Sequence, residues 1–205
     1  TFWSIKCKLL LFSLCISLIP IIVISVVYYY SARRELKQQI VEKMIAIAES
    51  KALHVNAFLN AIEGRCIDFS SDGYIRNELG KIKLNGSIDQ DSIVNLSKHI
   101  RDRKMPLDPD IVAITILDSA GTVAASTVES VIGEDFSDHE EFVYIVGKNK
   151  KEVFTHHPHF QEYLSHNTME VAAPITSMES GQTIGIIINA YNQELINKIT
   201  SNRKG

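Results

Sequence analysis

The sequence lacks the residue patterns that identify most enzymes and disulfide-stabilised proteins. It contains three cysteines, of which Cys7 and Cys15 lie in an apolar N-terminal segment and only Cys66 lies outside it. An internal disulfide is therefore not expected, and we expect Cys66 to be a small core residue. We find no nucleophile elbow, phosphate-binding glycine loop or zinc-protease motif in the 205 residues, which argues against catalysis.

Clustered positive charge is also missing. The formal net charge is -3, and the lysines and arginines are scattered along the chain. Phosphate backbones are bound by clustered basic residues, so no nucleic-acid partner is expected. The carboxylates of Asp138, Glu140 and Glu141 do cluster, but exposed acidic residues at the start of a helix are favoured by the helix dipole without any catalytic role. We expect no cofactor.

One long segment, residues 9–30, has no charged side chain at all. About 20 residues that each rise roughly 1.5 Å cross a hydrocarbon core of about 30 Å, so this segment is predicted to be a transmembrane helix behind a cytoplasmic flank, residues 1–8. Pro20 is tolerated in such a helix, and Tyr28 to Tyr30 stand where an aromatic belt is expected. A cleaved signal peptide is the alternative, but its apolar region usually has about 7 to 15 residues and a small-residue cleavage site.

The basic residues that flank this segment do not set its orientation. Lys6 and Lys8 precede it, whereas Arg33, Arg34 and Lys37 follow it, so the positive-inside rule does not favour an inside N-terminus.

A long amphipathic helix is predicted next, over residues 31–64. Its apolar residues recur at steps of three and four, with Lys51 in the one missing slot: Ile40, Met44, Ile47, Val55, Phe58 and Ile62. Such a helix extends about 50 Å at 1.5 Å per residue, which is more than a small domain needs, so we expect a stalk. An ordinary core helix is the alternative. The exposed half of the stripe needs a partner, and we therefore expect a homodimer through this helix.

The remainder, residues 65–200, is predicted to be an α+β module. Helical patterns cover residues 66–79, 93–104, 138–146 and 192–199, and strand patterns cover residues 111–117, 122–127, 152–156, 168–175 and 183–191. Tight turns join the strands except at one long connection. We therefore expect an antiparallel sheet of about five strands with flanking helices and with that connection across one face.

The order of four motifs in this module resembles a known family. ILDSAGTVAAST, IGEDFSDHEEF, MEVAAPI and GQTIGIIINAY follow the anchor and long helix, and together they are similar to Cache domains, the extracytoplasmic PAS-like sensors of bacterial receptors. The resemblance covers nearly the whole chain and is closest to the membrane-distal module of double-Cache receptors, with residues 201–205 as the start of a link to a following segment. It implies a bacterial inner-membrane protein whose sensor module is periplasmic or extracellular.

The resemblance also implies a function and a site. It implies the small-ligand-sensing input module of a receptor, such as a sensor histidine kinase or a chemoreceptor; a membrane-anchored protein-binding adaptor is the alternative. The implied ligand-binding residues are Asp138, His139, Phe142, Tyr144, Phe154, His156 and Asn189. Amino-acid-sensing members use an Arg and a Trp on the connection, and neither residue occurs between Pro106 and Ile199. A carboxylate would lack its usual bidentate partner, so an amino-acid ligand is not expected.

A cluster of four histidines, His156, His157, His159 and His166, suggests a second kind of site. Imidazole nitrogens bind zinc, copper or nickel, and in an extended segment His157 and His159 share one face. Pro158 leaves the strand geometry open. The alternatives are a polar pocket, a solvated loop, and a pH-responsive cluster of imidazoles.

Overall fold

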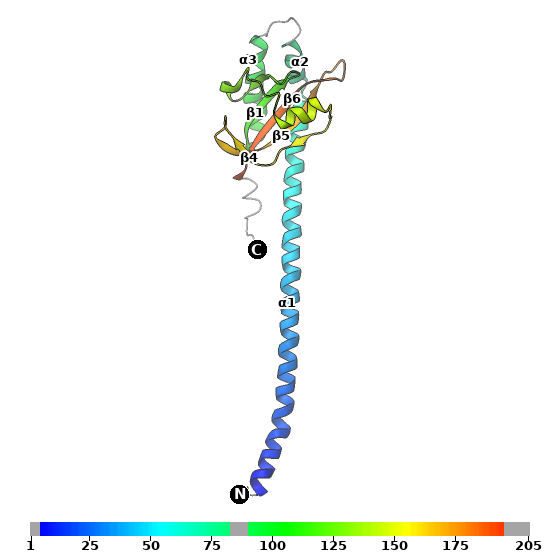
Figure 1. The fold of residues 1–205 in the computed structure, drawn as a ribbon, viewed down its shortest axis with the longest axis vertical. Coiled ribbons are helices and arrows are strands. Elements are labelled where there is room, and N and C mark those ends of the chain that lie inside the picture. Colours follow the sequence, from blue (N-terminus) through cyan, green and yellow to red (C-terminus); the bar gives the residue numbers. More distant parts are fainter. Residues whose placement is uncertain (1–4, 83–89, 195–205) are drawn as a thin grey trace. The chain divides into compact units, whose positions relative to one another are not determined.

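The computed structural model describes residues 5–82 and 90–194 and divides the chain into two compact units, residues 1–52 and 53–205 (Figure 1). Helix α1 (Ile5–Ser70) contributes to both units and continues through Pro20. In the first unit every described side chain except that of Lys51 is exposed, including the large apolar residues of the predicted span. Among the described residues, α1 is the one helix that is long and apolar enough to cross a membrane.

The second unit is built on an antiparallel sheet of six strands. Its strands are β1 (Ile111–Asp118), β2 (Val123–Ser126), β3 (Phe154–Thr155), β4 (His159–Gln161), β5 (His166–Thr176) and β6 (Thr183–Asn192). The order is β2-β1-β6-β5-β3, and β4 pairs with β5 as well. The predicted α+β class and antiparallel sheet are confirmed. The sheet has one strand more than expected, the short strand β4. This strand begins directly after Pro158, so the N–H that proline lacks is not needed for a hydrogen bond between strands.

A layer of helices covers one face of the sheet. The end of α1 packs there with α2 (Gly73–Lys81) and α3 (Gln90–His99), which lie together in Figure 1. The chain continues as a π-helix, η1 (Ile100–Lys104), and a short 3-10 helix, η2 (Met105–Leu107). A separate helix from Cys66 was expected, but α1 runs on to Ser70 before the chain breaks.

Asp72 is the residue that starts the new helix and ties this layer together. Its Oδ1 accepts hydrogen bonds from the backbone N–H groups of Tyr74 (2.8 Å) and Ile75 (3.1 Å), which caps α2. Its Oδ2 lies 2.6 Å from Nζ of Lys104, a mostly buried ammonium that also stands 5.2 Å from the ring centroid of Phe69. Burial opposes ionisation of Asp72, but the hydrogen bonds from Lys104 and the helix cap outweigh it and lower its pKa.

Side chains alternate between the two faces of the sheet, and each face has its own core. On β6, Ile187 and Tyr191 pack on the helical side with Cys66, which is fully buried as expected. Ile186 and Ile188 point to the other side. Residues 127–165, which we call the connection, cover that second face with η3 (Glu129–Val131), α4 (Glu140–Phe142) and the π-helix η4 (Val143–Gly147). The prediction that a long connection crosses one face is confirmed.

The turn between β1 and β2 anchors the start of the connection. Gly121 has φ +91°, and an added Cβ there would lie 2.6 Å from Cα of Ser137. Glycine is required by both the conformation and the close approach. The Gly121 carbonyl then accepts a hydrogen bond from the N–H of Phe136 (2.8 Å), which places α4 over the sheet.

Two predicted features fall wholly or almost wholly outside the described residues: the helix at residues 192–199 and the link at residues 201–205.

Candidate ligand-binding site

Two carboxylates are buried where the connection meets the sheet. Glu170 lies on β5 with 2% of its surface exposed, and Glu141 lies in α4 with 3% exposed. Glu170 faces the connection because β5 alternates, with Met169 and Val171 in the core under the helices and Ala172 in the core under the connection. We call Glu141, Glu170 and the four side chains that contact them, His139, His159, Gln161 and Tyr163, the acidic cluster.

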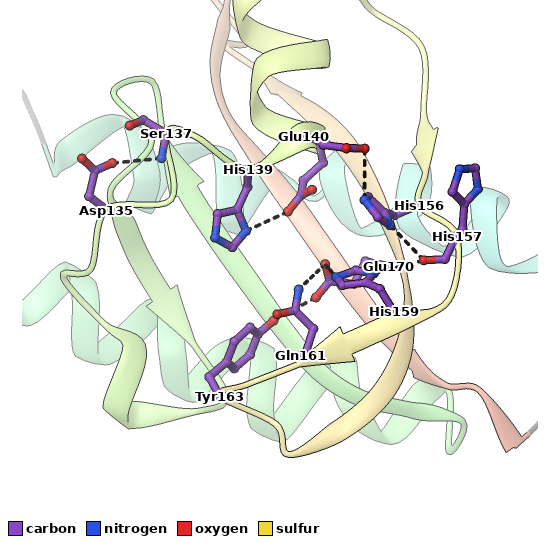
Figure 2. A network of polar contacts seen from close by, with 11 residues as sticks. Asp135, Ser137, His139, Glu140, His156, His157, His159, Gln161, Tyr163 and Glu170 are labelled. Atoms are coloured by element: carbon purple, nitrogen blue, oxygen red, sulfur yellow. Dashed lines mark hydrogen bonds and ion pairs between the residues drawn. The ribbon is translucent and has the colours of Figure 1, made fainter.

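Three side chains of the connection gather around Glu170 (Figure 2). The Gln161 amide donates to Oε2 (2.8 Å), and the Tyr163 hydroxyl donates to Oε1 (3.0 Å). Nε2 of His159 lies 3.8 Å from Oε2. Burial and the charge of Glu141 raise the pKa of Glu170, although Gln161 and Tyr163 both stabilise its ionised form. Burial and the charge of Glu170 raise the pKa of Tyr163, so its hydroxyl remains a donor.

Glu141 is paired with the histidine that precedes its helix. Nδ1 of His139 lies 3.3 Å from Oε1 of Glu141, and the His139 ring stacks on Phe136 with centroids 4.1 Å apart. The hydrogen bond to Glu141 raises the pKa of His139 against the effect of burial. Burial opposes ionisation of Glu141, but the hydrogen bond from His139 outweighs it and lowers the Glu141 pKa. The pair is therefore charged over a wider pH range than either group alone.

Two further histidines are oriented by the carbonyl of His157. Nδ1 of His156 (2.8 Å) and Nδ1 of His159 (3.0 Å) both approach this oxygen, which only accepts, so each Nδ1 carries the hydrogen. Their Nε2 atoms face carboxylates: His156 pairs with Glu140 at 3.1 Å and His159 faces Glu170. The ring of His157 points away from Glu170 (Figure 2). In the described part of the chain no group of three or more His, Cys, Asp or Glu side chains is arranged to hold a metal ion.

Most of the residues that the sequence analysis named lie on the connection, near the acidic cluster. The rings of Tyr144 and Phe154 are 4.9 Å apart, and His156 lies 5.9 Å from Phe154. Phe142 is buried in the core beneath α4. Asp138 is exposed at the start of α4.

Asn189 lies on the opposite face of the sheet. It alternates on β6 with Ile188 and Ala190, and its neighbours on the same face, Ile187 and Tyr191, belong to the core under the helices. Its amide is fully buried, and neither amide atom has a hydrogen-bond partner. The sequence indicated that a polar residue sits in the central strand, but not which face it occupies.

The acidic cluster itself was largely missed. Glu141 was expected to be an exposed helix-start residue, and it is buried because α4 turns this side chain toward the sheet. Glu170, Gln161 and Tyr163 were not considered. The available signal was Glu170, a single charged residue inside the otherwise apolar strand MEVAAPI, since unpaired charges are rarely buried.

Known proteins match this chain in structure but not in sequence. No family model and no curated protein matches the sequence. The sensor domain of the V. cholerae histidine kinase DctB aligns with a TM-score of 0.65 at 14% identity, over 81% of this chain and 61% of that chain. The E. coli DcuS sensor domain aligns with a TM-score of 0.53 at 15% identity, over 73% of this chain and 99% of that chain. The sensory domain of the Campylobacter jejuni chemoreceptor Tlp3 with isoleucine bound aligns with a TM-score of 0.58 at 10% identity, over 78% and 62%.

The chain has a Cache-type, PAS-like sensor fold. The predicted resemblance is confirmed at the level of the fold, which is what likenesses at 10–15% identity establish. The chain spans about three fifths of the DctB and Tlp3 domains. In this sensor fold the acidic cluster lies between the sheet and the connection, on the face that the helical layer does not cover.

Proposed function

We propose that the chain is the small-ligand-sensing input module of a membrane-anchored bacterial receptor, and that the ligand binds at the acidic cluster. The observation that carries the proposal is the burial of two carboxylates between the sheet and the connection of a sensor fold. Buried charges that core packing does not need are more often retained for function than for stability. The Tlp3 domain, which shares the fold, has isoleucine bound.

The proposed organisation along the chain follows the predicted boundaries. Residues 1–8 form a cytoplasmic flank, residues 9–30 span the bacterial inner membrane, residues 31–64 form a stalk, and residues 65–200 form a periplasmic sensor module. Residues 201–205 begin a link to a further segment. The length and composition of α1 support the span. A sensor histidine kinase is the proposed receptor type, since DctB is one, and a chemoreceptor like Tlp3 is the second candidate.

We also propose a homodimer through the long helix. Ile40, Met44 and Ile47 share one stripe of α1 and are 51%, 66% and 50% exposed. An apolar stripe of this kind is stabilised when a second copy covers it. A ligand that prefers one of two conformations of the module by a few kcal/mol is then enough to shift the receptor between states.

A thermal-shift screen tests the ligand-sensing proposal against the adaptor alternative. The full chain in detergent micelles would be screened against organic acids, amines, purines and divalent metal ions. Ligand sensing predicts that at least one compound raises the melting temperature and that its effect saturates with concentration. A uniformly silent screen would favour the protein-binding adaptor.

A further inference from the structure

The acidic cluster holds two buried carboxyl groups without a permanent positive charge beside them. The ion pairs of Glu141 and Glu170 are formed with histidines, His139 and His159, which are cationic only when protonated. The sequence has no arginine between Pro106 and Ile199. The three lysines of the connection, Lys148, Lys150 and Lys151, are all exposed. When the histidines are neutral, the cluster therefore favours a bound cation and repels an anion.

A separate observation at the same place is Thr168, which is fully buried on β5. Its hydroxyl has no hydrogen-bond partner, which is unfavourable in a protein interior. Thr168 and Glu170 are two positions apart in an uninterrupted ladder with β6, so both side chains leave the same face of β5. An unused acceptor beside a buried carboxylate is what a ligand with several N–H donors would satisfy.

Aromatic rings border the two carboxylates. Phe136, which stacks on His139, has its ring centroid 5.8 Å from that of Tyr163, and Tyr144 and Phe154 form a second pair on the connection. The exposed Lys148 already places its ammonium 5.8 Å from the ring centroid of Tyr144, so this ring accepts a cation. Carboxylates combined with aromatic faces are the side chains that recognise organic ammonium groups.

We propose that the ligand of this module is a small organic ammonium compound, whose charge is held between the carboxylates of Glu141 and Glu170. The inference rests on the proposed sensing function and names its ligand class. The N–H donors of the ligand would reach Glu170 and the free hydroxyl of Thr168, and its carbon chain would lie against the rings of Phe136 and Tyr163.

The cluster also couples binding to protons. Burial and Glu141 keep Glu170 partly protonated above the ordinary glutamate value of 4.5, and a bound cation favours its ionised form. The other titratable groups that face the cluster are His139 and Glu141 from the α4 segment and His159 and Tyr163 from β4 and the turn after it. The charges of Asp138 and His156 also act on His139 and Glu141, respectively. As pH rises, Glu170 ionises and His139 loses the charge that competes with the ligand. Affinity should therefore increase from pH 5.5 to pH 7.5, and binding should release protons.

Isothermal titration of the full chain in micelles tests the proposal with three ligands of similar size. These are n-butylammonium, n-butanol and n-butyrate, with 1,4-diaminobutane as a doubly charged probe. We expect the ammonium compounds to bind, more tightly at pH 7.5 than at pH 5.5, and the alcohol and the carboxylate to bind at least about tenfold more weakly. The heat of binding should differ between buffers of different ionisation enthalpy, because protons are released.

Three variants locate the charge. Glu170→Gln and Glu141→Gln should each weaken ammonium binding by about 30-fold or more. The matched control is Glu140→Gln, which removes the exposed neighbouring carboxylate and should leave affinity within about twofold. Near-UV circular dichroism checks that each variant is folded. If a variant does not fold, the comparison of the four ligands on the unaltered chain still tests the proposed ligand class.

Equal binding of butyrate and butylammonium, or unchanged ammonium binding by folded Glu170→Gln, would overturn the inference. If another compound class binds and ammonium compounds do not, the sensing function stands and this ligand class is wrong. If no class binds, the proposed function fails as well.

Discussion

The ion pair between Asp72 and Lys104 gives the sharpest prediction about stability. Asp72 performs two tasks, because one carboxylate oxygen caps α2 and the other pairs with Lys104 at 2.6 Å. The side chains are 19% and 11% exposed, so the ammonium has little water to replace a lost partner. Asp72→Ala should cost about 1 kcal/mol for the cap and about 2 kcal/mol for the unpaired ammonium. Asp72→Asn retains a capping oxygen and should lose only the second part.

Urea unfolding of the full chain in micelles, followed by near-UV circular dichroism of the buried tyrosines, measures these differences. We expect free energies of unfolding lower by about 3 kcal/mol for Asp72→Ala and about 2 kcal/mol for Asp72→Asn, with melting temperatures lower by roughly 6–12 °C and 4–8 °C. The double variant Asp72→Asn with Lys104→Met should recover part of the loss, because no charge is left unpaired. Equal stability of the unaltered chain and Asp72→Asn, or purely additive losses in the double variant, would refute the reasoning.

Three other predictions concern the sheet, the acidic cluster and the long helix. Gly185→Ala should disrupt the pairing of β1 with β6, because the added Cβ would clash with the Leu117 carbonyl. Hydrogen exchange of the β6 amides should then accelerate, and native-like protection of these amides would contradict the prediction. The pair of His139 and Glu141 should stabilise the fold above the ordinary glutamate value of 4.5 and below the raised His139 pKa, which lies above 6.5. His139→Gln should therefore lose stability at pH 6 and match the unaltered chain at pH 9 in thermal unfolding, and a pH-independent difference would exclude the ion pair. Single cysteines placed along the stripe of α1, for example at Met44, in a background without the native cysteines, should form disulfide-linked dimers in membranes. The proposed helix dimer is wrong if no position along the stripe crosslinks.

The fold was predictable from the sequence where one pattern dominates. The apolar run from Ile111 to Leu117 and the turn that ends at Gly121 specified the first hairpin, and the apolar runs at residues 168–175 and 183–191 specified β5 and β6. The strand β4 was missed because three residues after a proline carry too little pattern. The break at Asp72 was visible as Ser-Asp-Gly, but the helical periodicity on both sides hid where the first helix ends.

The site was less predictable because it depends on which face each side chain occupies. Glu141 and Glu140 are adjacent and identical in the sequence, yet one is buried beside Glu170 and the other is paired with His156 at the surface. That difference arises from how α4, only three residues long, packs on the sheet. Asn189 shows the same limit, since a shift of one position along β6 moves a side chain to the other face.

Hydrogen–deuterium exchange of the full chain, with and without the tightest ligand from the screen, tests the central claim most directly. Binding between the sheet and the connection predicts slower exchange in residues 134–165 and in β5. The exchange rates of the α1 amides between Ile40 and Ile47 should not change. Protection confined to the helical layer, or none in the connection at a saturating ligand concentration, would contradict the account.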